Sequence, residues 1–265
     1  MGTIFETKVS FPEEARDVYG HINNSFFPSG ITSSELEAQE QFPTIFNGFF
    51  TLFARYKYSK EVFPGEKLIV TIEQGDIPYK VLGEKGDIPY KVLGEKGEIR
   101  FTAVKKRLEP QAGNGKYWGR RDAEFPFIFE EGRVGIMDDC SIPNGTLKEQ
   151  GLGLLIHTVD YSTKYISLGK GPFCLTSSFS YNGWAPVIDL SQRLSTKGQD
   201  VAEANSKQVL VQFQEGGSPE VLRPQSEQFQ RILESLVGKT SLINLTLEQL
   251  NKIRGKALSS LDSLV

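Results

Sequence analysis

Cysteine and histidine are scarce in this sequence, which has two of each among its 265 residues. Cys140 and Cys174 form no CxxC pair, and they combine with His21 and His157 in no recognisable zinc-ligand spacing. So few cysteines, without paired spacing, are typical of a protein in a reducing compartment. We therefore expect a cytoplasmic protein without a metal ion or other cofactor.

Long apolar runs and a strong excess of one charge are also missing. No apolar segment approaches the ~18–20 residues of a membrane span, and the N-terminus lacks a basic-then-apolar signal. Glu6 stands where a myristoylation signal after Gly2 needs Ser or Thr. The net charge of −3 gives no reason to expect a nucleic-acid partner. With 38% hydrophobic and 24% charged residues, the chain is typical of one large globular domain or two small ones.

The most informative segment is Asp17-Val18-Tyr19-Gly20-His21-Ile22-Asn23-Asn24, which combines a carboxylate, a turn glycine, a histidine and an Asn pair. It lies between a strand-like segment, 3–11, and an apolar, partly helical stretch. At such a junction a carboxylate can face a helix N-terminus, whose free N–H groups stabilise a developing oxyanion. The pattern Asp-x-x-Gly-His-x-Asn-Asn arises by chance in roughly 1 in 10,000 chains of this length. The alternative is an Asx-turn and helix cap built from the same residues.

This segment resembles that of the hot-dog-fold acyl-thioester hydrolases of the 4-hydroxybenzoyl-CoA thioesterase type, where Asp-x-x-Gly-His-Val-Asn-Asn opens the long helix that the sheet wraps. Residues 56–68, with Pro64-Gly65-Glu66, look like the family's strand that ends in a Pro-x-Gly-Asp turn. Residues 122–129 look like its closing strand. The resemblance covers about residues 3–135 well and the rest loosely, and it implies an α+β fold.

The resemblance also implies a reaction, the hydrolysis of an acyl thioester of CoA or acyl carrier protein. Asp17 would be the nucleophile or the general base for water, and backbone N–H groups near His21 to Asn24 would bind the oxyanion. His21 would donate to the carbonyl or only hold the loop. Asn23 and Asn24 would fix the loop and Asp17 through hydrogen bonds.

Glu35 and Glu37 are alternative carboxylates, because related thioesterases use a glutamate on the helix. Glu35 is also explained by a capping box, Thr32-Ser33-Ser34-Glu35, which predicts a helix that begins at Thr32 and ends before Pro43. Here the chain departs from the family pattern, since Phe26-Phe27-Pro28-Ser29-Gly30 separates the Asn pair from that helix. Pro28 and Gly30 disfavour a helix interior, so the first turn is expected to be a separate piece.

Two further groups of residues have alternative interpretations. The aromatic residues of this region line an acyl pocket or form core: Phe26, Phe27, Phe42, Phe46, Phe49 and Phe50. The basic runs Lys105-Lys106-Arg107 and Arg120-Arg121 contact the phosphates of a carrier arm or form solvated faces.

An eleven-residue segment, Gly75–Lys85, recurs without a change as residues 86–96. An odd-numbered insertion inside a paired strand would move every following side chain to the opposite face. We therefore expect the repeat in a loop between strands at 67–73 and 98–106. It would be a flap over the substrate mouth or a duplication tolerated at a loop tip.

Similar spacing in the two parts of the chain predicts a double hot-dog. We expect a hot-dog domain at 1–136 with the repeat as an insertion at 75–96, a degenerate second copy at 137–225, and a helical extension at 226–265. Asp138 and Asn144 repeat the interval of Asp17 and Asn23, but Ile142 replaces the histidine and Gly145 the second asparagine. The second copy would thus supply walls rather than chemistry. The alternative is that two β-rich segments look alike by composition.

Strand periodicity is found at 3–11, 49–63, 67–73, 98–107, 117–130, 152–166, 172–181, 186–195 and 200–214, and helical periodicity at 226–236 and 246–265. A short helix is expected around 146–150. Two rival functions share the expected fold. One is a catalytically silent acyl-thioester-binding or assembly protein, and the other is a hot-dog dehydratase or hydratase. A homodimer of double hot-dog chains is left open.

Overall fold

The computed structural model describes residues 3–42, 50–73, 84–108, 118–164, 171–183, 185–214 and 219–264. Its strands form one eleven-stranded antiparallel sheet. They are β1 (Thr3–Val9), β2 (Phe50–Tyr58), β3 (Leu68–Glu73), β4 (Glu84–Leu93), β5 (Ile99–Leu108), β6 (Leu152–Thr163), β7 (Phe173–Ser180), β8 (Val187–Thr196), β9 (Gln199–Gln212), β10 (Glu220–Val221) and β11 (Thr240–Leu245). The described part also has five α-helices: α1 (Phe27–Gln41), α3 (Trp118–Asp139), α4 (Asn144–Glu149), α5 (Glu227–Leu236) and α6 (Leu247–Asp262). The α+β class is therefore confirmed.

The strand order is β1-β3-β4-β5-β2-β6-β9-β8-β7-β11, with β10 paired to β9. The central pair β2–β6 joins a first half (β1 to β5) to a second half (β6 to β11). Counted outward from this pair, the halves have matching orders, 2-5-4-3-1 and 6-9-8-7-11. The outermost strands correspond as well, because β11 pairs with β7 as β1 pairs with β3. They differ in chain order, since β1 is the first strand of its half and β11 is the last.

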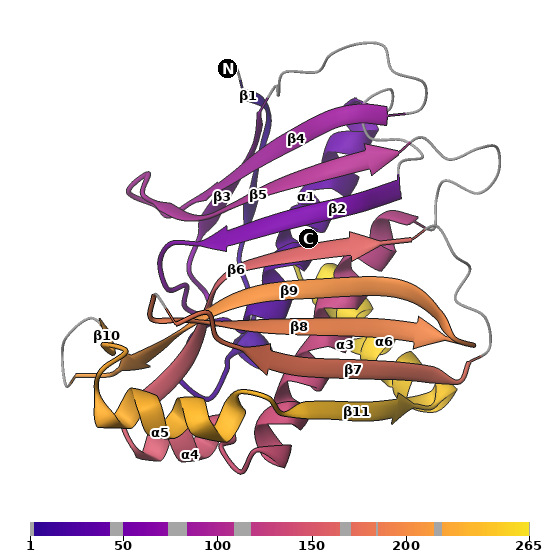
Figure 1. The fold of residues 1–265 in the computed structure, drawn as a ribbon. Coiled ribbons are helices and arrows are strands. Elements are labelled where there is room, and N and C mark those ends of the chain that lie inside the picture. The colour runs from indigo at the N-terminus through magenta and orange to yellow at the C-terminus, as the bar shows by residue number, and fades with distance from the viewer. Residues whose placement is uncertain are drawn as a thin grey trace.

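Three helices lie on one face of the sheet, with α1 behind the first half and α3 and α6 behind the second (Figure 1). Seven of the nine strands expected from the sequence are present within two or three residues, as are α5, α6 and the short α4, while β2 ends at Tyr58, five residues earlier than expected. The segment 226–265 differs from the expected helical extension, because β11 lies between its two helices and completes the sheet.

The helix α1 begins at Phe27, not at Thr32 as predicted. A short 3₁₀ turn, Asn24–Phe26, precedes it and is capped by Asn23 Oδ1, which accepts from the Ser25 N–H at 2.9 Å. Pro28 falls in the first turn of α1, where its missing N–H costs nothing. Gly30 lies against Phe11, whose Cζ would be 3.0 Å from an added Cβ.

The capping box at Thr32 is consequently wrong, because this residue lies inside the helix. Glu35 instead accepts from Tyr90 Oη at 2.5 Å and pairs with Lys105 Nζ at 3.0 Å, and both charged side chains are buried. Lys105 is therefore neither a solvated surface charge nor a phosphate ligand. The side chains of the other basic residues in the two runs lie outside the described part.

The predicted strand at 117–130 is also wrong, since this segment forms most of α3. Ala123, Phe125, Phe127, Ile128 and Phe129 are all buried. The helix packs between the sheet and the helices α1 and α6, so its apolar residues point in several directions and show no single helical stripe. Pro126 inside the helix further weakened the helical signal.

Helix α3 approaches the sheet through Gly132. An added Cβ there would lie 2.6 Å from Gln192 Nε2, 2.7 Å from Leu175 Cδ2 and 2.9 Å from Ser177 Oγ. Gln192 Nε2 cannot move aside without loss, because it donates to Phe129 O at 2.7 Å and Ser177 Oγ at 3.1 Å.

Gly132→Ala is therefore expected to lower the free energy of unfolding by about 1–3 kcal/mol through overpacking. The ~1 kcal/mol by which alanine normally favours a helix offsets only part of this overpacking cost. Gly255→Ala in α6 is the matched control, because nothing lies within 4 Å of an added Cβ there, and it should stabilise the protein. Urea unfolding of the two variants measures the difference. Equal stabilisation by both would contradict the tight packing at Gly132.

The loop prediction for the repeat is wrong for its second copy. Tyr90 to Leu93 pair with both β3 and β5, Ile88 and Pro89 pair with β5, and the side chains of Tyr90 and Val92 are buried. Most of the first copy lies outside the described residues. The pairing of β4 with β5 shifts register between Lys85 and Ile88, where the two copies meet, and is regular from Ile88 to Val92.

Deleting residues 75–85 or 86–96 gives the same chain, because the copies are identical. The remaining copy can supply the eight residues of β4 from Gly86 to Leu93, which include the buried Tyr90 and Val92, whereas Glu84 and Lys85 belong to the other copy. We expect cooperative unfolding and a free energy of unfolding within about 1 kcal/mol of the parent, because loop length affects stability only slowly. Thermal and urea unfolding test this. A non-cooperative transition would show that both copies are needed for the sheet.

Candidate active site

The loop around Asp17 is a tight turn between β1 and α1. Asp17 Oδ1 accepts from the N–H groups of Tyr19 at 2.8 Å and His21 at 3.1 Å, and the Asp17 N–H donates to His21 O at 2.7 Å. Gly20 has φ +93°, which side-chain-bearing residues rarely adopt. The Asx-turn expected as an alternative is thus present. Asp17 Oδ2 has no hydrogen-bond partner among the described residues, so one carboxylate oxygen is available for chemistry.

Most of the predicted oxyanion donors are already used within the loop. His21 N–H donates to Asp17, the Ile22 N–H to Val62 O at 2.8 Å, and the Asn23 N–H to Ala15 O at 2.9 Å. The Asn24 N–H has no partner among the described residues and stands at the start of the 3₁₀ turn that leads into α1. Of the four backbone N–H groups predicted to bind the oxyanion, the Asn24 N–H is therefore the one that remains available.

Asn23 ties the loop to the second half of the sheet. Its Nδ2 donates to Glu130 Oε1 of α3 at 3.2 Å. Arg133, one helical turn further along, pairs with the same carboxylate through contacts of 2.6 and 2.8 Å. Burial would raise the pKa of Glu130, but Arg133 and the Asn23 hydrogen bond outweigh it and hold that pKa below its usual range. The pair is therefore charged and fixes the loop.

His21 lies at the outer side of the loop. Its ring packs edge-to-face on Phe63 with centroids 5.1 Å apart, and its Nε2 is 3.6 Å from Glu61 Oε1. These neighbours come from the segment after β2. They orient the ring whichever of its two proposed roles it has.

Asp17 forms part of the boundary between two hollows. A cavity of about 290 Å³ is lined by residues that include Tyr19, Asn23, Glu130, Arg133 and Asn144. A groove of about 560 Å³ is lined by residues that include His21, Tyr58, Phe63, Val209 and Val211. Asp17, Asn24, Leu155 and Ile156 line both. The candidate site is therefore a junction, built by the first-half loop and the second-half strand β6.

The second half contributes polar groups that the sequence interpretation missed. His157 lines the groove and is the extra residue at a bulge of β6, where the pairing with β9 shifts between Ile156 and Thr158. Bulges commonly re-aim a side chain beside an active site. Tyr19 was also missed. Its hydroxyl donates to Asn144 O at 3.3 Å, and its pKa is raised to about 12, mainly by burial.

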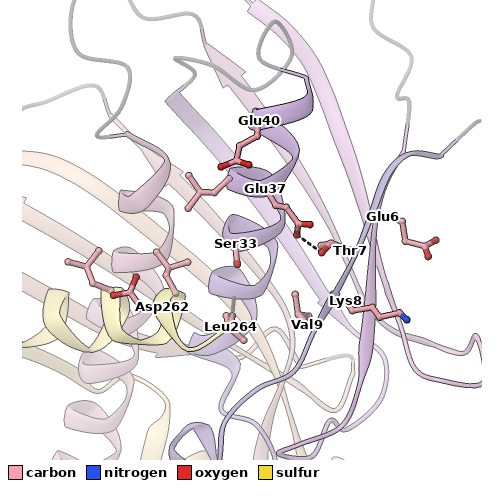
Figure 2. A pocket seen from close by; sticks show the side chains of 12 residues that line it. Glu6, Thr7, Lys8, Val9, Ser33, Glu37, Glu40, Asp262 and Leu264 are labelled. Carbon is pink, nitrogen blue, oxygen red and sulfur yellow. Dashed lines mark hydrogen bonds between the residues drawn. The ribbon is translucent and has the colours of Figure 1, made fainter.

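The alternative carboxylates lie elsewhere. Glu35 points into the core of the first half, as described above. Glu37 accepts a hydrogen bond from Thr7 in a separate hollow of about 750 Å³ between β1, α1 and the end of α6 (Figure 2). Glu40 and Asp262 line this hollow as well. Neither alternative lines the cavity or the groove beside Asp17.

The aromatic residues of the motif region are core where they are described. Phe27 is buried between Phe11 and Phe101, at centroid distances of 5.4 and 4.6 Å. Phe26 packs on Phe127 of α3 at 4.9 Å, and Phe42 on Phe5. Phe46 and Phe49, and the side chain of Phe50, lie outside the described part. The core interpretation is therefore favoured over an acyl pocket.

Within the described residues, no group of three or more His, Cys, Asp or Glu side chains is placed to hold a metal ion. No described helix is long and apolar enough to cross a membrane.

Comparison with solved structures decides the fold. The 12:0-ACP thioesterase from Umbellularia californica matches 82% of this chain and 94% of its own, with a TM-score of 0.54 and 8% identity. An acyl-CoA thioesterase II from Mycobacterium marinum matches 73% and 92%, with a TM-score of 0.51 and 8% identity. A protein assigned as an oleoyl thioesterase from Lactobacillus plantarum matches 77% and 94%, with a TM-score of 0.55 and 7% identity.

The chain has the fold of these thioesterases. The resemblance drawn from the Asp17 segment is therefore confirmed at the level of fold. No protein-family model and no curated protein sequence matches the chain. At 7–8% identity, the shared thioesterase fold does not identify the reacting residues, which have to be argued from the geometry of the site.

Proposed function

We propose that this protein hydrolyses acyl thioesters of CoA or acyl carrier protein, with Asp17 as nucleophile or general base. The observation that carries the proposal is the place of Asp17 and Asn24 on the boundary between two hollows. A thioester has two arms that diverge from its carbonyl. A carboxylate and a backbone N–H at the point where two hollows meet are suited to act on that carbonyl.

In this proposal the Asn24 N–H donates to the carbonyl oxygen as it gains charge. Asp17 Oδ2 either attacks the carbonyl carbon, which expels the thiolate and leaves an anhydride for water to cleave, or removes a proton from the attacking water. The Asx-turn holds Asp17 Oδ1 through the Tyr19 and His21 N–H groups, and this fixes the orientation of the reacting Oδ2. Glu130 and Arg133 hold the loop through Asn23.

We also propose that the two halves are two hot-dog units that pair within one chain. The matching strand orders support this, as does the equivalent place of α1 and α3 before β2 and β6. The predicted boundary after residue 136 falls inside α3. We therefore place the boundary before Trp118 and assign β11 to the second unit. An internal pair of this kind makes the second unit a wall of the Asp17 site.

A catalytically silent acyl-thioester-binding protein is the second candidate, because three of the loop N–H groups are already bonded. A panel of acyl-CoA and acyl-carrier thioesters, with free thiol detected, separates the two functions. Hydrolysis predicts saturable thiol release from members of the panel. Binding of the same thioesters without any release of thiol would support the silent function instead.

A further inference from the structure

Tyr19 connects the Asp17 turn to the second half of the protein. Its N–H donates to Asp17 Oδ1 at 2.8 Å, and its ring packs on that of Phe213, with the ring centroids 5.1 Å apart and the planes at 31°. The Tyr19 hydroxyl donates to Asn144 O, at the start of α4, at 3.3 Å. One residue therefore links the Asp17 carboxylate to two segments of the second half.

Phe213 is itself held against β6. It directly follows β9, and its N–H donates to Gly151 O at 2.8 Å. Its ring lies over Gly153 of β6, where an added Cβ would be 2.7 Å from Phe213 Cε2 and 3.4 Å from Tyr19 Cζ. The two rings can pack in this way because residue 153 has no side chain. Tyr19, Gly153 and Phe213 together are called the Tyr19 stack below.

The loop that carries Asp17 is held at both of its ends. On the Asp17 side, Lys148 Nζ of α4 donates to Val18 O, next to the Tyr19 stack. On the other side, the Ile22 and Asn23 N–H groups donate to backbone oxygens of the first half. The Asx-turn fixes the shape of the loop from within, whereas these outer contacts fix where the turn stands relative to the two hollows.

The place of a reacting carboxylate affects the rate strongly, because a displacement of about 1 Å can cost about 100-fold. Phe213 lines neither hollow, so it has no contact with a substrate bound there. Its path to the reaction runs through the Tyr19 ring and the N–H that Tyr19 donates to Asp17.

We infer that Phe213 is a positioning residue, which aims Asp17 Oδ2 at the junction of the two hollows through the Tyr19 stack. This inference rests on the proposed thioester hydrolysis. It adds to the same site a residue of the second half that lies outside both hollows.

The test measures kcat and KM of Phe213→Ala, which removes the ring that supports Tyr19. We expect kcat to fall about tenfold and KM to stay within about twofold, because the lining of both hollows is unchanged. Phe213→Leu keeps an apolar side chain against Tyr19 and should lose only about threefold. Tyr181→Ala is the matched control, because Tyr181 packs on Phe229 in the second half at 5.6 Å and lines neither hollow. It should keep kcat even where it lowers stability.

A double-mutant cycle with Asp17→Asn separates positioning from general damage to the site. Because Phe213 acts through the Asp17 carboxylate, Phe213→Ala should lower kcat of the parent but not the residual rate of Asp17→Asn. An equal loss in both backgrounds, or an unchanged kcat in a folded Phe213→Ala protein, would overturn the inference. Phe213→Leu takes the place of Phe213→Ala in the cycle where the alanine variant does not fold.

If the wild-type protein cleaves no thioester, the proposed function fails separately, and hydrogen exchange decides the inference. The Tyr19 and His21 amides donate to Asp17 Oδ1, whereas the Ile22 amide donates to Val62 O of the first half. In Phe213→Ala the first two amides should exchange about tenfold faster relative to the Ile22 amide, and in Tyr181→Ala this ratio should not change. The same ratio in Phe213→Ala as in the parent would contradict the role of Phe213.

Discussion

Asp17→Asn is expected to lower kcat for thioester hydrolysis about 100-fold or more while the fold survives. Asparagine keeps a side-chain oxygen that accepts from the Tyr19 and His21 N–H groups, so the turn persists. The substitution removes only the negative charge that would attack the carbonyl or take a proton from water. Steady-state thiol release and thermal unfolding of the same preparation measure both parts of this expectation.

Asp138→Asn serves as the matched control for this substitution. Asp138 is exposed near the end of α3 and lines neither the cavity nor the groove. Its replacement should leave kcat and the unfolding temperature unchanged. Near-normal hydrolysis by a well-folded Asp17→Asn protein would remove Asp17 from the reaction. The proposal would then have to move to another group beside the groove, of which His157 is the first candidate.

Glu130→Ala is expected to destabilise the protein by about 3–5 kcal/mol, because it leaves a buried charge without its partner. The Arg133 side chain is only 10% exposed and would lose both contacts with Glu130. Asn23 would lose the acceptor that connects the Asp17 loop to α3. Urea unfolding measures the loss. The double variant Glu130→Leu/Arg133→Met is the control, since replacing both charges by apolar groups should recover most of the stability.

The same pair predicts how stability depends on pH. The pKa of Glu130 is lower in the folded protein than in the unfolded chain, so the unfolded chain takes up the proton first as the pH falls. The stabilisation by Glu130 is therefore complete above the ordinary glutamate pKa and is lost as the pH falls through the lowered value. Glu130→Gln should show a shallower loss of unfolding free energy in acid. Identical acid profiles would contradict the charged pair.

The sequence alone was sufficient for the features that depend on local pattern. Alternation of apolar residues located strands such as β6 to β9, and helical periodicity at 246–265 located α6, which the structure shows to begin with a capping box at Thr246. The Asp17 segment pointed to the thioesterase fold, which the structural comparison confirms. These signals depend on residues close together in the sequence, so they do not depend on the tertiary packing of the rest of the chain.

The errors occur where tertiary packing overrides the local pattern. Helix α3 is buried on several sides, so its apolar residues lack an amphipathic stripe and were interpreted as a strand. That error hid Glu130 and Arg133, whose spacing of three places them on one helix face. The second repeat copy supplies most of β4, although an odd-numbered insertion was expected only in a loop. His157 gave no signal beyond its rarity, because a bulge in β6 depends on pairing with β9.

The most direct test of hydrolysis at the Asp17 junction is a progress curve of thiol and free-acid release under excess acyl-CoA. The wild-type protein should release many equivalents of thiol per chain, with an equal amount of acid, and Asp17→Asn should release about one hundredth as much in the same time. Equal and slow release by both proteins, or tight binding of the acyl-CoA with no thiol released by the wild type, would contradict it.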